Sequence, residues 1–206
     1  MGFLSPRRVG HVHLSRDAIV STALELLTQY GLADVTMRRV ATNLGVAPGA
    51  LYWHVANKQS LIAAMTARIL SPVTGESTAE LVSSLHSELQ RWRDGAEVAI
   101  AGASFPESSA SADLEKLFTK ALQKEAPDAR PEDRAVAART LIHYTLGATF
   151  MEQSREQLSG AAPGGTSPST ASTAAESAPV DSTSVRAAEL MVAGLRSLQG
   201  EHIHQN

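Results

Sequence analysis

Residues 44–58 of the chain read Leu44-Gly-Val-Ala-Pro-Gly-Ala-Leu-Tyr-Trp-His-Val-Ala-Asn-Lys58. The glycine after Leu44 predicts the end of a helix, and the proline at position 48 predicts the first residue of a very short one. With about 100° per residue, Leu51 and Val55 share the inward face of the short helix, and Trp53 points nearly opposite. A single turn that exposes so much aromatic surface predicts contact with a partner.

Capping signals frame the helices before and after this stretch. Ser15, Thr36 and Asn57 each stand directly before a run of residues with helical apolar spacing, which predicts three N-caps. Gly31 and Gly45 follow the first and second of these runs and predict C-terminal caps. The first third of the chain therefore predicts four helices, of which the second and third form a helix-turn-helix.

The net charge of −3 hides an asymmetry along the chain. Residues 1–70 hold seven Arg or Lys against three Asp or Glu, and the remainder holds eleven against eighteen. A basic first part on an acidic body predicts a polyanion as the partner of the first part. Residues 1–14, with two arginines and two histidines, predict a flexible basic arm that either follows a DNA groove or has no role of its own.

The second helix and the short helix carry the side chains expected at DNA. Arg38 and Arg39 lie in the first turn of a helix, where a cation opposes the helix dipole unless an anion is bound. A phosphate is the expected anion, and the cap Thr36 would help to bind it; the alternative is two solvated surface arginines. The candidate DNA-binding residues are Thr36, Arg38, Arg39, Pro48, Gly49, Ala50, Tyr52, Trp53, His54 and Lys58. Arg38 is the best candidate for a guanine contact, because the short helix offers no Arg, Asn, Gln or Asp.

This pattern resembles the DNA-binding domain of the TetR family of repressors. The match covers residues 14–70 and places in register the cap Thr36, the glycine turn, the cluster Leu51-Tyr52-Trp53-His54-Val55 and Lys58. In that family the residues at all of these candidate positions except that of Arg39 contact operator DNA, so the resemblance implies an all-α repressor with double-stranded operator DNA as its partner. It also implies that the fourth helix connects the reading head to the body.

The remaining sequence predicts a helical body. Amphipathic spacing predicts helices at 78–93 and 112–124, a long helix near 132–158 and a last helix near 184–199. The long helix is apolar on nearly every side, so one side needs cover from outside its own chain. The long and last helices therefore predict a homodimer through a four-helix bundle, with docking inside one chain as the alternative. Residues 159–183 are rich in Ser, Thr, Ala, Gly and Pro and predict a flexible loop.

The body also resembles the tetracycline-repressor subgroup, through Arg93-Asp94-Gly95-Ala96-Glu97-Val98 and His143-Tyr144-Thr145-Leu146-Gly147. That subgroup holds a drug-chelated magnesium with a histidine and a glutamate, and Ala99 and Met151 stand at these positions here. Without hard-metal ligands we expect no magnesium chelate, no metal and no cofactor, but a small apolar effector. The candidate ligand-binding residues are Leu81, Leu85, Phe105, Phe118, His143 and Met151, and plain core packing is the alternative for each.

Composition narrows the classes of function. The chain has no cysteine, no apolar run of the roughly 18 residues that a membrane span needs, and no signal-peptide pattern. We therefore expect a cytoplasmic protein that does not contact a membrane. An enzyme would have to use His86, His143, His202 or His204, but no His-Glu pair, activated nucleophile or glycine-rich phosphate loop accompanies them. We expect no catalytic residue.

These observations predict an all-α protein with an arm at 1–14, a helix-turn-helix domain at 15–70 and a ligand-binding and dimerisation domain at 71–206. The expected function is that of a transcription repressor that a small apolar effector releases from a palindromic operator. Two other interpretations stay open. One is an architectural DNA binder whose body is only packed core, and the other is a regulator that activates transcription.

Overall fold

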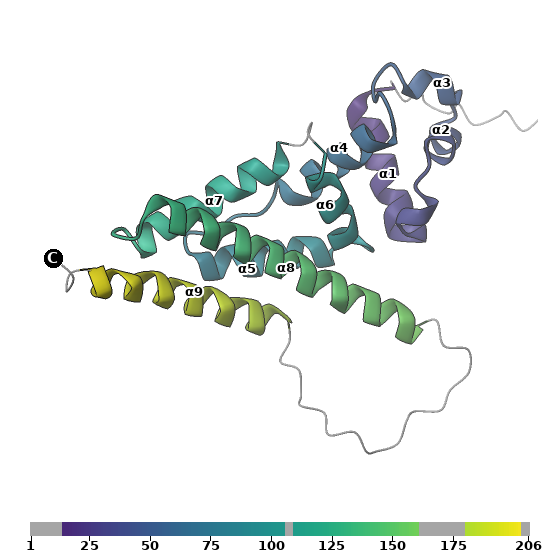
Figure 1. Ribbon diagram of the computed structural model, residues 1–206. Helices are drawn as coiled ribbons and strands as arrows, with labels where there is room; N and C mark the ends of the chain where they lie inside the picture. Colours follow the sequence, from purple (N-terminus) through teal and green to yellow (C-terminus); the bar gives the residue numbers. More distant parts are fainter. Residues whose placement is uncertain (1–13, 106–108, 161–179, 203–206) are drawn as a thin grey trace, which may run out of the picture.

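The computed structural model describes residues 14–105, 109–160 and 180–202. All regular elements in these ranges are helices and none is a strand, which confirms the all-α prediction. The helices form an elongated molecule, with α3 at the tip of a small head and α8 and α9 on the side away from it (Figure 1). The predicted arm at 1–14, except for its last residue, and most of the predicted loop at 159–183 lie outside the described residues.

Four helices and one 3-10 turn build the head. They are α1 Arg16–Tyr30, η1 Leu32–Asp34, α2 Met37–Leu44, α3 Pro48–Leu51 and α4 Lys58–Leu70. Apolar residues at helical spacing on each element meet in one core, because Ile19, Leu27, Val40, Leu51 and Leu61 are all fully buried. The sequence analysis placed Leu51 on an inward face, and the structure agrees.

The head helices begin and end where the capping signals predict. Ser15 Oγ accepts a hydrogen bond from Ala18 N, Thr36 Oγ1 accepts from Arg39 N, and Asn57 Oδ1 accepts from Ser60 N. Each bond satisfies a backbone N–H that a helix start leaves without an intrahelical partner. Local chemistry alone therefore sets these three boundaries.

The body consists of five further helices in the described ranges. They are α5 Thr78–Gln90, α6 Gly95–Ala103, α7 Ala110–Glu125, α8 Pro131–Gly160 and α9 Val180–His202. The sequence analysis did not predict α6. It also ended α8 too early and started α9 too late, so both ends of the predicted loop are helical.

The connecting helix α4 belongs to both parts of the molecule. It packs against α1 in the head and packs closely against α6 in the body. Thr66 on α4 is fully buried, and its hydroxyl donates to Val98 O on α6 at 2.8 Å. A Cβ added at Gly102 would lie 2.0 Å from Thr66 Oγ1, so only glycine permits this close crossing of the two helices. The position of the head therefore depends on α6.

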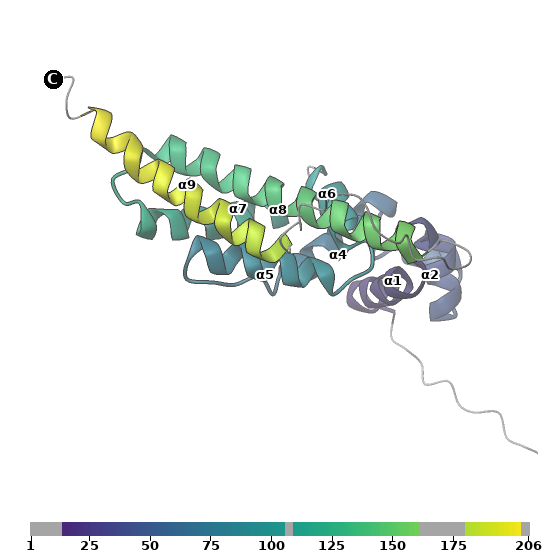
Figure 2. The same ribbon diagram turned by 90° about the horizontal axis from the view of Figure 1, so that it is seen from below.

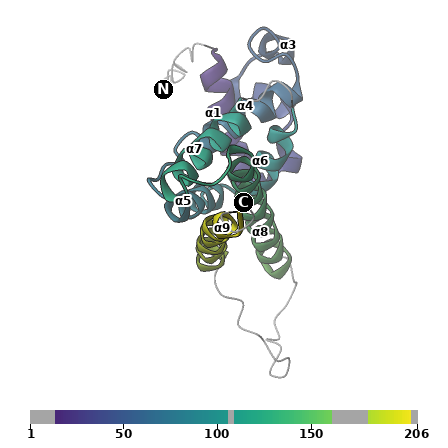
Figure 3. The same ribbon diagram turned by 60° about the vertical axis from the view of Figure 1, so that its left-hand side comes forward.

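Among the residues that the structure describes, helix α8 is covered on one side only. Ala138, Leu141, Thr145 and Thr149 are buried against the rest of the body. Helix α9 lies beside α5 and the first half of α8, whereas the second half of α8 runs on past the start of α9 (Figures 1 and 2). The two helices form the side of the molecule opposite α3 (Figure 3).

Candidate nucleic-acid interface

The turn between α2 and α3 fixes the angle at which α3 is presented. Gly45 adopts the left-handed conformation with φ of 68°, and Val46 N donates to Ala41 O at 3.0 Å. This bond pattern is the Schellman ending of a helix, in which glycine tolerates the positive φ. Leu51 and Val55 then anchor the short α3, because both are almost completely buried.

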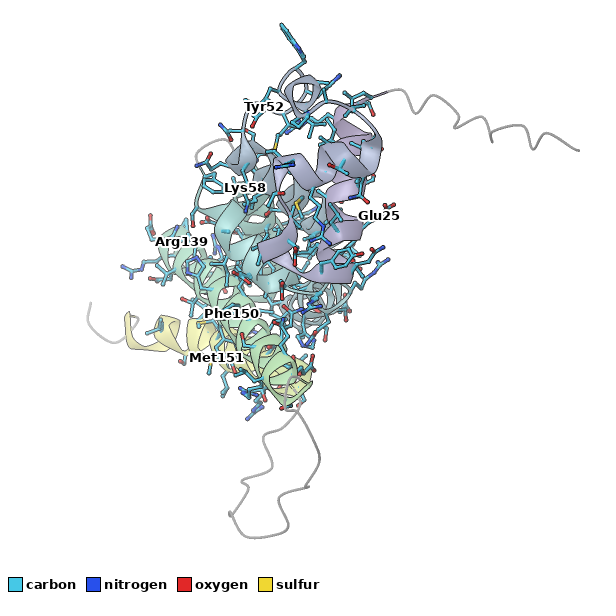
Figure 4. All side chains as sticks on the ribbon, turned by 90° about the vertical axis from the view of Figure 1, so that its right-hand side faces the viewer. Glu25, Tyr52, Lys58, Arg139, Phe150 and Met151 are labelled. Carbon is cyan, nitrogen blue, oxygen red and sulfur yellow. The ribbon has the colours of Figure 1, made fainter. Side chains whose placement is uncertain are left out.

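The other side of α3 is open. Trp53 exposes 90% of its surface and Tyr52 exposes 52%, and His54 and Lys58 are exposed beside them. Figure 4 shows Tyr52 and Lys58 on the head, with Tyr52 toward its tip. The predicted phase of α3 is confirmed, since these aromatic rings do not pack in the core.

The two neighbouring arginines of α2 have different surroundings. The Arg39 guanidinium forms an ion pair with Asp34 and lies over the ring of Tyr30, 3.9 Å from its centroid. It thereby ties α2 to the end of α1 and to η1. Arg38 is exposed, and its guanidinium has no hydrogen-bond or ion-pair partner among the described residues. The guanidinium of Arg38 is therefore the one of the two that is available to a partner. Asp34, five residues before Arg39, is the sequence signal that distinguishes the two arginines.

Nothing in the described part of the chain requires a glycine at position 49 of α3. A Cβ added at Gly49 would meet nothing within 4 Å, and its φ lies outside the left-handed region that favours glycine. Pro48 and Ala50 flank it, and both are small or compact. An open surface without a side chain allows another molecule to approach the backbone closely.

We predict that Gly49→Ala separates folding from binding. The added methyl group meets no atom of the protein and replaces glycine in a helix, so the free energy of unfolding should stay constant or rise by at most about 1 kcal/mol. If DNA approaches this backbone, operator affinity should fall about tenfold or more. Thermal unfolding and fluorescence anisotropy with labelled operator DNA measure the two effects. Unchanged affinity would show that α3 does not lie close to the bases.

The six candidate ligand-binding residues do not come together in one chain. Leu81, Leu85 and Phe118 are fully buried in the body core, and Phe105 is half-buried. His143 is exposed and Met151 exposes 58% of its surface, both on the outer face of α8. A helix that is apolar all round does not reveal which side faces inward, so the sequence alone could not place the last two.

The body does contain a small cleft between α4 and α7. It has a volume of about 170 Å³, and its apolar walls include Leu70 and Val73 on one side and Leu114 and Leu117 on the other. Asp113 and Ser71 provide polar groups at the same cleft. Because α4 forms one wall, a molecule bound here would touch the helix that carries the head.

Within the described ranges, no cluster of three or more His, Asp or Glu side chains could hold a metal ion. In the same residues, no helix is both long and apolar enough to cross a membrane. Ala99, which the sequence analysis aligns with a metal-binding histidine of the tetracycline repressors, is fully buried.

Known proteins share this architecture and much of this sequence. The family model described as "Bacterial regulatory proteins, tetR family" matches residues 19–65, from α1 into α4. The tetracycline repressor protein class D of Escherichia coli is 30% identical over 151 residues, which make up 68% of this chain and 67% of that protein. The chain belongs to the TetR family. It is therefore a DNA-binding regulator of transcription, and its relatives in the family are regulators of transcription.

Solved structures of the TetR family cover nearly the whole chain. BioQ of Mycobacterium smegmatis has a TM-score of 0.74 at 31% identity and covers 89% of this chain and 98% of its own. BioQ in complex with its natural double-stranded DNA operator has a TM-score of 0.71 at 31% identity, with the same coverage. The body of this TetR-family regulator, like its head, thus has the architecture of a family member.

Proposed function

We propose that this TetR-family protein is a homodimeric repressor that a small, apolar, metal-free molecule releases from a near-palindromic operator. The observation that carries the proposal is the open surface of α2 and α3, where the side chains of Arg38 and Trp53 and the backbone of Gly49 have neither partners nor cover among the described residues. Groups of this kind bind DNA by phosphate contacts, close backbone approach and base contacts. A DNA partner also implies a place in the bacterial cytoplasm.

The proposed DNA contacts divide by their chemistry. Arg38 is the base reader, because a guanidinium fits the two acceptors of guanine in the major groove. Tyr52, His54 and Lys58 donate to phosphate oxygens, and the N-terminus of α2 with its cap Thr36 binds a further phosphate. The surface of Pro48, Gly49, Ala50 and Trp53 reads thymine methyl groups and groove shape. Arg39 supports this surface from behind through Asp34 and Tyr30.

We propose that a second copy of the chain covers the outer faces of α8 and α9. Large apolar side chains are exposed there, namely Val136, Tyr144, Phe150, Met151, Leu158, Leu190 and Leu198. Gly147 and Gly194 lie inside these helices, and a Cβ added at either would meet nothing within 4 Å. A glycine inside a helix costs about 1 kcal/mol relative to alanine, and the close approach of a partner helix would explain that cost. Four helices, two from each copy, would form the bundle.

Release by an effector then follows from the position of α4. In the DNA-bound dimer the two heads should stand about 34–36 Å apart, so that both copies of α3 enter successive major grooves. An effector in the cleft between α4 and α7 favours release under one condition. It must bind a dimer whose head spacing does not fit the operator more tightly than it binds the DNA-bound dimer. The apolar walls of that cleft favour an apolar molecule.

Arg38→Ala should relax specificity at one base pair of the operator, at a cost of about 1–3 kcal/mol in binding free energy. Lys58→Ala is the matched comparison, because it removes a phosphate contact, weakens binding to every sequence and lowers the salt dependence. Affinities for a set of single-substitution operators, measured at several salt concentrations, distinguish the two. Equal weakening by Arg38→Ala over all operators would make Arg38 a phosphate contact instead.

Tetracycline with magnesium should leave the protein on its operator. The chain offers Ala99 and Met151 where the related repressors have metal-binding side chains, and an apolar side chain does not bind Mg²⁺. Titration of the protein–operator complex with tetracycline and MgCl₂, followed by anisotropy, measures this. Release at micromolar drug would contradict the proposed metal-free effector.

One observation favours a second candidate, a DNA binder that responds to no ligand. Leu81, Leu85 and Phe118, which the sequence assigns to an effector pocket, are fully buried in the core. A thermal-shift screen with small apolar molecules separates the two candidates, since only a sensor gains stability from a specific compound. Repression and activation differ in where the operator lies relative to the promoter. Footprinting locates the operator.

A further inference from the structure

Asp94, in the turn between α5 and α6, has an unusual backbone. Its φ of 57° is left-handed, and no other residue with a side chain has a positive φ in the described part of the chain. Asp tolerates this conformation better than most residues, but it still costs free energy that the surroundings must supply. Gly95 follows, and a Cβ there would lie 2.2 Å from Leu89 O. The turn is therefore tight and holds the Asp94 side chain in one direction.

The Asp94 carboxylate joins three parts of the molecule. Oδ2 accepts a hydrogen bond from Leu32 N, in the head, at 2.7 Å, and Oδ1 accepts from the side-chain amide of Gln157, near the end of α8. Asp94 stands at the N-cap position of α6, yet its side chain makes no capping bond there. An aspartate at this position ordinarily caps its own helix, so its use toward the head and α8 is a specific feature of the fold.

The turn that carries Asp94 is fixed firmly to α8. The buried amide of Gln153 accepts from Ala96 N at 3.1 Å and donates to Leu89 O and Trp92 O at 3.1 and 3.0 Å. Gln153 and Gln157 are one helical turn apart on α8, so two side chains of this helix hold the same turn. Asp94 therefore moves with α8 and α6 and not with the head.

A second acidic group lies near Asp94. Burial raises the pKa of Glu97, one turn further along α6, and the nearby Asp94 adds to the rise. Asp94 exposes only 9% of its surface, so its oxygens depend on the N–H donors of Leu32 and Gln157 for hydrogen bonds. Loss of such a donor leaves a buried carboxylate oxygen without a hydrogen bond, which is unfavourable in free energy. The closed state of the bond from Leu32 to Asp94 is therefore favoured over the open one.

We propose that Asp94 is a positioning residue for operator binding, because it holds the head at a second point and thereby sets the separation of the two heads in the dimer. This inference rests on the proposed function. Helix α4 alone would let the head pivot about one connection. Leu32 lies beyond the opposite end of α1 from the α4 connection, and Gly31 approaches Asp94 so closely that an added Cβ would lie 2.7 Å from Oδ2. A movement of α6 away from α4 would carry Asp94 from Leu32 and free the head.

Two variants test this role, with the full-length protein as the sample. Asp94→Gly keeps the backbone conformation and removes both bonds, whereas Asp94→Asn keeps the shape and one acceptor oxygen. Asp128→Asn is the control, since it makes the same charge change at an exposed loop position. The probes are a duplex that the wild-type protein selects from a random pool, the same duplex with one extra central base pair, and a duplex with a single half-site.

We expect Asp94→Gly to bind the selected duplex at least tenfold more weakly than wild type and to lose most of the preference over the lengthened duplex. Half-site affinity should not change, and Asp94→Asn should fall in between. In hydrogen-exchange measurements the Leu32 amide should lose protection in Asp94→Gly while amides inside α1 keep theirs.

Three results would overturn the inference. Full-site affinity equal to that of Asp128→Asn would show that Asp94 does not position the head. An equal loss of half-site affinity would show that Asp94 only supports the structure of the head. Unchanged protection of the Leu32 amide would show that the bond from Leu32 to Asp94 does not hold the head. If wild-type protein selects no duplex with two half-sites, the proposed function itself fails, and this outcome is distinct because it appears before any variant is made.

Discussion

Gly102→Ala should destabilise the protein by about 1–3 kcal/mol or more, which corresponds to a fall in Tm of roughly 2–10 °C for a chain of this size. The new methyl carbon would lie 2.0 Å from Thr66 Oγ1 and 2.7 Å from Thr66 Cβ. Rotation of the Thr66 side chain moves the oxygen but not its Cβ, so the two helices must separate. Because α4 carries the head, the surviving folded protein should also bind operator more weakly.

A double-mutant cycle identifies the cause of that loss. Thr66→Ala removes the nearest atom, and with it the hydrogen bond from Thr66 to Val98 O, so it should be destabilising on its own. Combined with Gly102→Ala it relieves part of the overlap, and the two effects should be clearly non-additive. Gly49→Ala is the matched control, because the same methyl group there meets no atom of the protein. Additive losses of stability in the cycle would show that the crossing of α4 and α6 accommodates the added methyl group.

The head could be predicted in detail because its signals are local. Caps such as Thr36 and Asn57 act within three residues, and the phase of Leu51 and Val55 follows from helical geometry alone. The exposure of Trp53 follows from the same phase. The pairing of Arg39 with Asp34 needed the fold of η1, which brings the two side chains together.

The body could be predicted only in outline. Helix α6 has a sequence of Gly, Ala, Val and Ile with one charge, so it shows no polar and apolar sides, and it was missed. The inner and outer faces of α8 could not be told apart, so the sequence did not reveal that His143 and Met151 lie on the face of α8 that is exposed in one chain. The contacts of Asp94 join residues more than sixty positions apart, and no local pattern announces such contacts.

Phe150→Glu combined with Leu190→Glu should convert the protein into a monomer and reduce operator affinity by about a hundredfold or more. Phe150 on α8 and Leu190 on α9 belong to the outer faces assigned to the second copy, and Figure 4 shows Phe150 beside Met151 on α8. Carboxylates buried in that interface would remain unpaired, which costs several kcal/mol at each copy. A monomer loses the linked second head, and linkage of two binding modules contributes a factor of about 10²–10⁴ to affinity.

The monomer should keep its fold and its affinity for a single half-site, because Phe150 is already 39% exposed in one chain and Leu190 more so. Ile100→Glu is the control: Ile100 on α6 is 40% exposed, so the substitution places one carboxylate, at an exposure like that of Phe150, outside the faces of α8 and α9. Sedimentation velocity gives the mass, and anisotropy gives both affinities. A double variant that stays dimeric would move the interface away from α8 and α9. A monomer with full operator affinity would show instead that one head suffices, and the spacing of two heads would then have no part in recognition.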